Sequence, residues 1–349
     1  MRNLYKLFKI QNTKKWNKFI SMFNSSNILD ISLILPDHFL ENYMSDIEEA
    51  NKVLVEKDMS LNYIERYNNQ QKIFSSLNAA KINLISYKVF KELEKNESIL
   101  SNLNSFKPKN GFSNIVSYDQ VKTVSGRLVN NKNSPNILTL PARCRKIFQS
   151  RWNYDGDLLY VDFKNLEPRV IRSINGKSSS DDIYSEISAS LDFEVDRVII
   201  KRGIISTLYG SSSQIEGLSK ERSDSVLNAT KEYFDLESIL KKADVVNDIG
   251  CRNNFFGRPI WNIEETQSNK LINNYIQSTA VDVALTYFSE LVEKIDKDLC
   301  KPIFIIHDAL VLDVKNEYIE ELKNITDKGY NCPLLGNFPV ETAKLSETY

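Results

Sequence analysis

The sequence lacks the residue pattern of a structural zinc site. Its 349 residues include only two histidines, His38 and His307, and its four cysteines form no Cys-x-x-Cys pair. A structural zinc site needs four closely spaced Cys or His ligands, so none is expected. Cysteines this scattered also suit a reducing compartment better than a disulfide framework.

Long apolar runs and a large net charge are missing as well. No stretch of eighteen apolar residues occurs, so we expect no membrane-spanning segment. The formal net charge of −1 argues against coating of nucleic acid by overall charge, so any nucleic-acid-binding surface must be local. We expect a cytoplasmic protein, in the host cytoplasm if a phage encodes it, with an organelle as the open alternative.

The N-terminal residues 1–23 carry six basic residues and no acid. They lack the uninterrupted apolar stretch of a secretory signal. Two interpretations stay open, namely a solvated basic helix or arm and an organelle transit peptide. Five of the six basic residues are Lys, whereas transit peptides are rich in Arg, which favours the first interpretation.

The rest of the chain combines helical and extended patterns. Hydrophobic residues make up 42% of the sequence, which is enough for a sizeable core. Residues 1–118 show helical spacing of apolar residues, whereas residues 119–161 have an extended or loop-like pattern. Together with the later elements, this order indicates an α+β fold. Those later elements are a strand at 158–163, helices at 193–209 and 268–294, and a hairpin at 302–314.

Two acids stand at the ends of apolar runs. Asp162 follows Leu158–Val161, and Asp308 follows Ile303–Ile306. An ionised acid beside a buried strand is costly unless it is paired or binds a metal. Two such acids brought together would suit Mg²⁺, which binds through one or two carboxylates together with substrate phosphates. The alternative is two unrelated acids at strand ends.

A stripe of four residues marks the helix expected near residue 200. Arg197, Lys201, Ile205 and Tyr209 recur every four residues, so they follow one helix face. The two cations at its start can hold a polyphosphate, and Tyr209 offers a ring for stacking on a base. Gly203 in mid-helix indicates close approach by another element. An ordinary amphipathic helix with solvated cations is the alternative.

Two further stretches suit nucleic-acid binding. Residues 120–151 contain no acid, and their basic side chains can neutralise several phosphates. Asn273 and Gln277 lie one helical turn apart, and side-chain amides can contact minor-groove acceptors or sugar oxygens. Either stretch alone could be a solvated polar surface. The basic residues of the first stretch are Lys122, Arg127, Lys132, Arg143, Arg145, Lys146 and Arg151.

Taken together, these stretches resemble the motifs of family A DNA polymerases, the bacterial DNA polymerase I type. Asp162–Val170 resembles motif A, D-Y-S-x-x-E-x-R-V; Arg197 to Gly210 resembles motif B; and Ile306-His307-Asp308 resembles the start of motif C, V-H-D-E-L-V. The matches occur in the family's order over about residues 120–345. Further matching segments are Thr123–Leu128, Pro135–Ile137, Arg143–Phe148, Phe256–Arg258 and Asn273–Asp282.

The resemblance implies template-directed DNA synthesis by two-metal-ion nucleotidyl transfer, with DNA primer–template and dNTPs as partners. Asp162, Asp308 and the Phe163 carbonyl would hold two Mg²⁺ ions, with Mn²⁺ as a substitute, and Lys201 would act as an acid toward pyrophosphate. Glu167 would exclude a 2′-hydroxyl and accept a hydrogen bond from Tyr209. Nucleotide binding falls to Arg197, Lys201, Ile205, Tyr209 and Glu167, and primer–template binding to Arg127, Arg143, Arg145, Asn273, Gln277 and His307.

The same resemblance implies a right-hand polymerase with an antiparallel palm sheet, helical fingers and a reduced helical thumb. We expect no room for a proofreading exonuclease or a 5′ nuclease, and modest processivity unless a processivity or replisome partner assists. The implied parts are a thumb-like region at 1–118, palm at 119–196, fingers at 197–262 and palm again at 263–349.

Three departures from the family pattern qualify these expectations. Ile205 replaces an aromatic residue, Ala309 replaces the motif C glutamate, and Pro168 replaces a leucine. Lys201-Arg202 with Tyr209-Gly210-Ser211 also resembles motif B of single-subunit phage RNA polymerases. An RNA polymerase or primase-like activity is therefore an alternative, although Glu167 favours DNA synthesis. A catalytically silent nucleic-acid-binding subunit is the second alternative.

Overall fold

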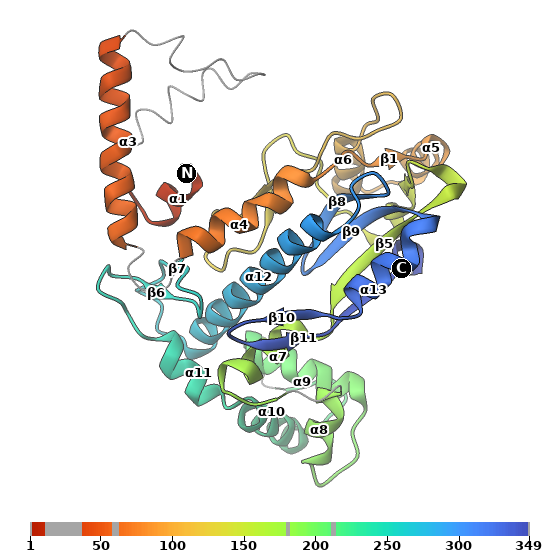
Figure 1. The fold of residues 1–349 in the computed structure, drawn as a ribbon. Coiled ribbons are helices and arrows are strands. Elements are labelled where there is room, and N and C mark those ends of the chain that lie inside the picture. Colours follow the sequence, from red (N-terminus) through yellow and green to blue (C-terminus); the bar gives the residue numbers. More distant parts are fainter. Residues whose placement is uncertain (1, 11–36, 58–62, 179–181, 211–213, 348–349) are drawn as a thin grey trace.

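The computed structural model describes residues 2–10, 37–57, 63–178, 182–210 and 214–347. Most of the basic N-terminal stretch and Ser211 of the motif B comparison lie outside these ranges. A four-stranded antiparallel sheet, in the order β12-β5-β9-β8, forms the centre of the fold (Figure 1). Its strands are β5 (Gly156–Phe163), β8 (Cys300–Ile306), β9 (Ala309–Lys315) and β12 (Val340–Lys344).

The expected strand and hairpin are both present in this sheet. Leu159 and Val161 of β5 are buried, and β8 and β9 are joined by the two residues His307 and Asp308. In the pairing of β5 with β9, Asp162 lies opposite Ala309. The register therefore places Asp162 and the turn that carries Asp308 side by side, at the same end of the two central strands.

The long helix α12 (Ser268–Lys294) covers one side of the sheet. The aromatic ring of Phe163 packs against the rings of Tyr287 and Phe288 of α12, with centroids 5.3 and 6.0 Å apart. Helix α4 (Tyr63–Ser76) runs along the other side of α12 (Figure 1). Because α12 is enclosed from several sides, buried residues occur nearly all round it rather than on one stripe.

A cluster of short helices lies beyond one end of the sheet. Within it, α9 packs closely on α10, and Gly203 marks the point of contact. A Cβ atom at Gly203 would come within 2.6 Å of Val226 Cγ1 on α10, so the close approach expected from a mid-helix glycine is present. The cluster consists of α7 (Leu166–Ile174), α8 (Ile183–Ala189), α9 (Arg197–Tyr209), α10 (Lys220–Phe234) and α11 (Leu236–Ala243).

Two boundaries differ from the sequence-based expectation. Helix α9 begins at Arg197 rather than at residue 193, because Asp196 has extended backbone angles and stands at the N-cap. The segment 119–161, expected to be extended or loop-like, also contains two 3₁₀ turns, η2 (Ala142–Ile147) directly after Pro141 and η3 (Asn153–Asp155). Proline fixes a backbone angle suited to the start of such a turn.

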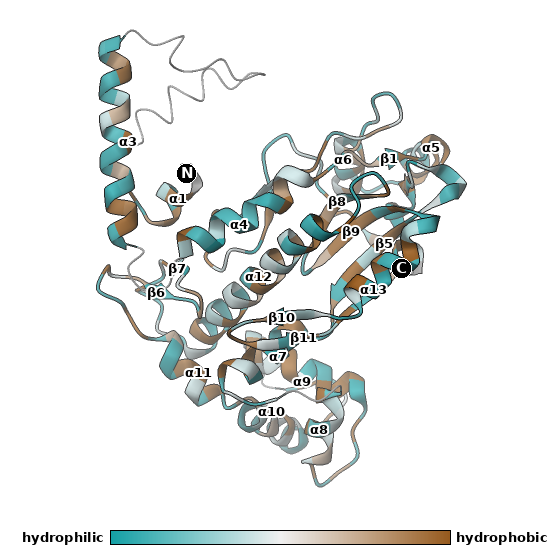
Figure 2. Cartoon of the chain, in the orientation of Figure 1, coloured by the Kyte–Doolittle hydropathy of each residue, from teal (hydrophilic) through white to brown (hydrophobic). Residues whose placement is uncertain are grey.

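The remaining elements are short, except for the 21-residue helix α3 (Asp37–Lys57). Helix α3 points away from the rest of the molecule in Figure 1, and hydrophilic and hydrophobic residues alternate along it in Figure 2. The other helices are α1 (Arg2–Leu7), α3 (Asp37–Lys57), α5 (Leu84–Leu93), α6 (Glu97–Ser105) and α13 (Ile319–Thr326), with the 3₁₀ turns η4 (Asn316–Tyr318) and η5 (Leu345–Glu347). The two-stranded pairs are β1 (Lys81–Ile82) with β4 (Phe148–Gln149), β2 (Tyr118–Asp119) with β3 (Val129–Asn130), β6 (Arg252–Asn253) with β7 (Pro259–Ile260), and β10 (Tyr330–Cys332) with β11 (Gly336–Phe338).

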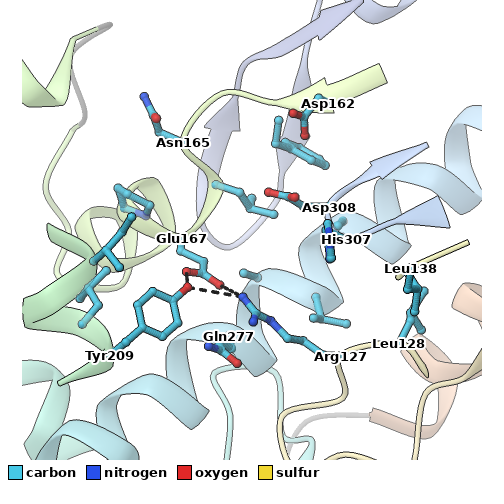
Figure 3. A pocket seen from close by; sticks show the side chains of 18 of the residues that line it. Arg127, Leu128, Leu138, Asp162, Asn165, Glu167, Tyr209, Gln277, His307 and Asp308 are labelled. Atoms are coloured by element: carbon cyan, nitrogen blue, oxygen red, sulfur yellow. Dashed lines mark hydrogen bonds and ion pairs between the residues drawn. The ribbon is translucent and has the colours of Figure 1, made fainter. Parts of the chain in front are cut away.

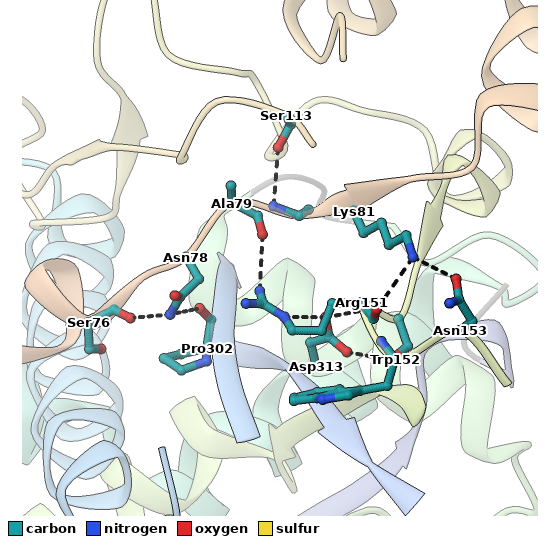
Figure 4. Close-up of polar contacts among 12 residues, drawn as sticks. Ser76, Asn78, Ala79, Lys81, Ser113, Arg151, Trp152, Asn153, Pro302 and Asp313 are labelled. Atoms are coloured by element: carbon teal, nitrogen blue, oxygen red, sulfur yellow. Dashed lines mark hydrogen bonds and ion pairs between the residues drawn. The ribbon is translucent and has the colours of Figure 1, made fainter. Parts of the chain in front are cut away.

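A buried ion pair fastens the approach to β5 onto the sheet (Figure 4). Asp313 of β9 is fully buried and accepts hydrogen bonds from Ser150 Oγ at 2.7 Å and from Arg151 N and Nε at 3.0 and 2.9 Å. Arg151 Nη2 also donates to the Ala79 carbonyl at 3.1 Å. Breaking a pair of this kind typically costs about 3–5 kcal/mol, so these contacts hold β5 firmly in register.

No helix within the described ranges is long and apolar enough to cross a membrane, in agreement with the sequence.

Candidate active site

A cleft of about 1060 Å³ opens where the sheet edge, the helix cluster and α12 meet (Figure 3). The end of β5 and the start of α7 form one wall, and α9 forms another. Gln277, Ala280 and Ala284 of α12 contribute to the lining, and the segment from Arg127 to Asn130 lies across from them. Several parts of the chain that are distant in sequence thus meet around one space.

Both strand-end acids face this cleft. Asp162 lies near the end of β5, and Asp308 is the second residue of the two-residue turn between β8 and β9. The first turn residue, His307, has a φ of 58°, in the left-handed region where two-residue hairpin turns usually carry Gly, Asn or Asp. A backbone held in this region at a histidine is typical of functional sites.

The environment of the two carboxyl groups disfavours their charged forms. Burial, and then the charge of Asp308, raise the pKa of Asp162 to about 7. Burial also raises the pKa of Asp308. A hydrogen bond from its own backbone N–H lowers this pKa in part, and so do the nearby His307 and Arg127. The nearby positive charges therefore offset the cost of burial only in part.

One carboxylate oxygen has no partner at all. Asp162 Oδ1 is buried and has no hydrogen-bond partner. A divalent cation bound by oxygen ligands would satisfy this atom and relieve the repulsion between the two carboxylates. In the described part of the chain no third acid, His or Cys completes a metal-binding group, in keeping with Ala309 at the position of the motif C glutamate. Two carboxylates fit Mg²⁺, which keeps waters and shares substrate phosphates.

On the opposite wall, three side chains form a connected group. Tyr209 OH donates a hydrogen bond to Glu167, as the family resemblance implied. Arg127 Nη2 forms an ion pair with Glu167 Oε1 at 3.0 Å and donates to Tyr209 OH at 3.4 Å. Burial, followed by the Glu167 charge, raises the pKa of Tyr209 to about 12, so its hydroxyl stays protonated as the donor. This group links helix α7 to the last turn of α9.

The predicted stripe on α9 lies only partly in the cleft. Lys201, Ile205 and Tyr209 line it. Arg197, one turn earlier, does not; its guanidinium lies 3.8 Å from Asp182 Oδ1 and 4.5 Å from the centre of the Tyr184 ring. Arg197 is exposed and lies at the outer end of the stripe. A bound polyphosphate would have to extend beyond the cleft lining to reach it.

The predicted nucleic-acid-binding residues divide into two groups. Gln277 and His307 line the cleft, and Gln277 Nε2 donates to Asn273 Oδ1 at 2.6 Å, which connects Asn273 to the lining. Arg143 lies outside the lining and pairs with Glu94.

Arg145 lies outside the lining too, but close to it. Its Nε is buried without a hydrogen-bond partner, and its charge acts on Tyr160 of β5. Burial and the charges of Asp162 and Asp308 raise the pKa of Tyr160, whereas Arg145 lowers it. The Arg145 charge therefore acts on the same tyrosine as the two acids.

Sequence reasoning missed several lining residues. Asn130 faces the cleft, and both polar atoms of its side chain are buried without a hydrogen-bond partner. Tyr184 of α8 and the apolar Leu128 and Leu138 also line it. The interpretation of residues 120–151 considered only their basic side chains. It therefore did not predict that Asn130, Leu128 and Leu138 of the same segment would line the cleft.

The raised pKa of Asp162 predicts a stability that depends on pH in the metal-free protein. This carboxyl group has a pKa of about 7 when folded against an ordinary 3.8, so the folded state binds more protons between these values. Stability should therefore fall as the pH rises from about 4 to about 7, by about 1–2 kcal/mol after allowance for partial exposure. Urea unfolding at pH 4.5, 6 and 7.5 measures this change.

Asp162→Asn should flatten that profile, because it removes the titrating group and its repulsion of Asp308. Asp248→Asn, in an exposed loop, is the control and should follow the unaltered protein. Equal slopes for Asp162→Asn and the unaltered protein would contradict the assignment.

Comparison with known proteins supports the fold. No family model and no curated protein matches this sequence. Among solved structures, the polymerase domain of Pol1 from M. smegmatis, determined in complex with DNA primer-template and dNTP, matches with a TM-score of 0.51 and 18% sequence identity. The match covers 71% of this chain and 50% of that one, so the chain spans about half the length of this neighbour. The chain has a DNA polymerase I-like polymerase fold.

Proposed function

We propose that this chain is a template-directed DNA polymerase of the family A type, which adds dNTPs to a primer 3′ end. The observation that carries the proposal is the single cleft in which Asp162 and Asp308 meet the Lys201 and Tyr209 face of α9. The acid pair suits phosphoryl transfer, and the facing helix suits a nucleoside triphosphate. The likeness to a polymerase domain agrees with this arrangement.

The acid pair would hold Mg²⁺. Asp162, Asp308 and the main-chain carbonyl of Phe163 are the proposed ligands for two ions, with Mn²⁺ as a substitute. When bound, the ions would activate the primer 3′-hydroxyl and stabilise the negative charge that develops on the phosphates. The unpartnered Oδ1 of Asp162 supports this assignment.

The α9 residues would handle the triphosphate. The primer 3′-oxygen forms a bond to the α-phosphorus, and the bond to the pyrophosphate oxygen breaks. Lys201, which lines the cleft, would bind the β- and γ-phosphates and donate a proton to the departing pyrophosphate. Arg197 would contact the outermost phosphate once it leaves Asp182, and the 3.8 Å separation of that pair on an exposed surface makes its release inexpensive.

The opposite wall would read the sugar and the base. The Glu167 side chain, held by Tyr209 and Arg127, would exclude a 2′-hydroxyl. Ile205 and Tyr209 would pack against the nascent base pair. Arg127, Gln277, Asn273 and His307 would contact the primer–template terminus, with Arg143 and Arg145 on the adjoining phosphates.

Primer extension tests the proposal. A labelled primer–template with Mg²⁺ should be extended with dNTPs by the unaltered protein, and Asp308→Asn should lower the rate by at least about 1000-fold because several kcal/mol of transition-state stabilisation are lost. Asp248→Asn is the matched control and should extend normally. Extension with ribonucleotides would favour the RNA-synthesis alternative. Primer–template binding without extension in any lane would favour the silent binding subunit.

The role of Glu167 gives a second prediction. Glu167→Ala should raise ribonucleotide incorporation relative to deoxyribonucleotide incorporation by at least about tenfold, because the group that crowds a 2′-hydroxyl is removed. Single-nucleotide incorporation with paired dNTP and NTP measures the ratio. Glu186→Ala is the control, since Glu186 also accepts a hydrogen bond from a tyrosine, Tyr233, but outside the cleft. A ratio unchanged in Glu167→Ala would rule out this role.

A further inference from the structure

A fully buried arginine lies beneath the segment that carries Arg127. Arg258 belongs to the loop between β6 and β7 and is the largest side chain that the structure buries completely. Asn254 Oδ1 accepts hydrogen bonds from Phe256 N and Arg258 N, both at 2.9 Å, and so closes this loop. The Asn254 Nδ2 atom in turn donates to Ser278 Oγ at 3.1 Å and Asp282 Oδ2 at 2.6 Å, which anchors the loop on α12.

The Arg258 charge is balanced through a relay rather than by a direct ion pair. Arg258 Nη1 donates to Tyr63 OH at 3.0 Å, and Tyr63 OH donates to Asp282 Oδ1 at 3.1 Å. Asp282 is also fully buried and accepts a hydrogen bond from Gln70 Nε2 at 3.0 Å. Burial raises the pKa of Asp282, and the nearby Arg258 cation lowers it. These groups fix the guanidinium between α4 and α12.

The other edge of the guanidinium supports the Arg127 segment. Arg258 Nη2 donates to the Gln120 carbonyl at 2.8 Å. At Gly126 the backbone has a φ of +76°, and a Cβ atom there would lie 2.7 Å from Arg258 Cζ and 2.8 Å from Nε. Arg258 Nε is buried and has no hydrogen-bond partner, so this part of the side chain faces the Gly126 backbone by packing alone. Only glycine allows this approach.

The first part of the turn above Arg258 has other supports. Gln120 Nε2 donates to Gln70 Oε1 of α4 at 2.7 Å, and Asp119 Oδ1 accepts hydrogen bonds from the backbone N–H groups of residues 121 and 122. Near Gly126 the contacts are internal to the turn: Gly126 N donates to the Thr123 carbonyl at 3.2 Å, and Thr123 Oγ1 donates to the Arg127 carbonyl at 2.8 Å. Arg258 thus supports the turn from the body of the protein at Gly126, directly before Arg127 reaches out to Glu167 and Tyr209.

We propose that Arg258 is a positioning residue for nucleotide selection: it holds the 120–127 turn so that Arg127 reaches Glu167 and Tyr209. The inference rests on the proposed function for its consequence, because Glu167 and Tyr209 are the groups assigned to the sugar and the base. Arg258 acts from outside the cleft and touches no substrate. Its loss loosens Arg127, and with it the orientation of the Glu167 carboxylate.

The first experiment measures the turn directly and needs no activity. Gly126→Ala pushes a methyl group against Arg258, whereas Gly111→Ala, at a φ of +82° with no atom within 4 Å, imposes similar backbone strain without that contact. Hydrogen–deuterium exchange at residues 121–127 should rise at least about tenfold in Gly126→Ala and in Arg258→Lys. It should stay unchanged in Gly111→Ala. Equal protection in all four proteins would overturn the proposal.

The second experiment tests the route through Arg127. Arg258→Lys should lower the preference for dNTP over NTP about as much as Arg127→Ala does, by roughly tenfold. The double variant Arg258→Lys/Arg127→Ala should show no further loss of preference. The change at Arg258 acts only through the Arg127 side chain, which the double variant lacks. Additive losses would show that Arg258 does not act through Arg127 and would overturn the proposal.

The two experiments separate this inference from the proposed function. If the unaltered protein extends no primer, the proposed function fails, and the exchange measurement alone decides whether Arg258 holds the turn. If extension occurs while exchange at 121–127 is unaffected by Arg258→Lys, the proposed function stands and the positioning role fails. Should Arg258→Lys not fold, Gly126→Ala against Gly111→Ala still gives the answer.

Discussion

The repulsion between two desolvated carboxylates is the constraint on which the site depends. Asp162 lies near the end of β5, and Asp308 lies in the turn directly before β9, the strand with which β5 pairs, so the register that stabilises the sheet also forces like charges together. Burial raises the pKa values of both groups, and one oxygen of Asp162 is left without a partner. The sheet can maintain this arrangement because its interior is apolar and Asp313 with Arg151 fixes the approach to β5 from behind. Such an arrangement is useful only if a cation or a proton completes it.

Helix α12 carries a further buried acid, Asp282, both of whose carboxylate oxygens accept hydrogen bonds. One face of the helix lines the cleft through Gln277 and Ala280, and the neighbouring face presents Asp282 to Tyr63, Gln70 and Asn254. A satisfied buried network is rigid, whereas a partly satisfied one is costly. The contrast separates the two roles: the Asp282 network holds the scaffold still, and the Asp162–Asp308 pair leaves capacity for a ligand.

The sequence predicted those features that depend on local pattern. Apolar runs located β5 and the β8–β9 hairpin, helical spacing located α12, and the four-residue stripe located α9 to within four residues at its start. The family resemblance supplied the Tyr209–Glu167 hydrogen bond. Contacts set by tertiary placement were not predictable: the Arg127–Glu167 pair, the Arg197–Asp182 pair, and Arg258 beneath Gly126 join segments whose relative positions no local pattern encodes. The unpaired amide of Asn130 escaped notice for the same reason.

The most direct test of the account is a crystal structure of the protein with primer–template, a non-hydrolysable dNTP and Mn²⁺, with the ions located by anomalous scattering. The account predicts two Mn²⁺ ions about 3.5–4 Å apart, bound by Asp162 and Asp308, with the triphosphate against Lys201 and the sugar against Glu167. Ions bound away from both aspartates, or a nucleotide outside the cleft, would contradict it.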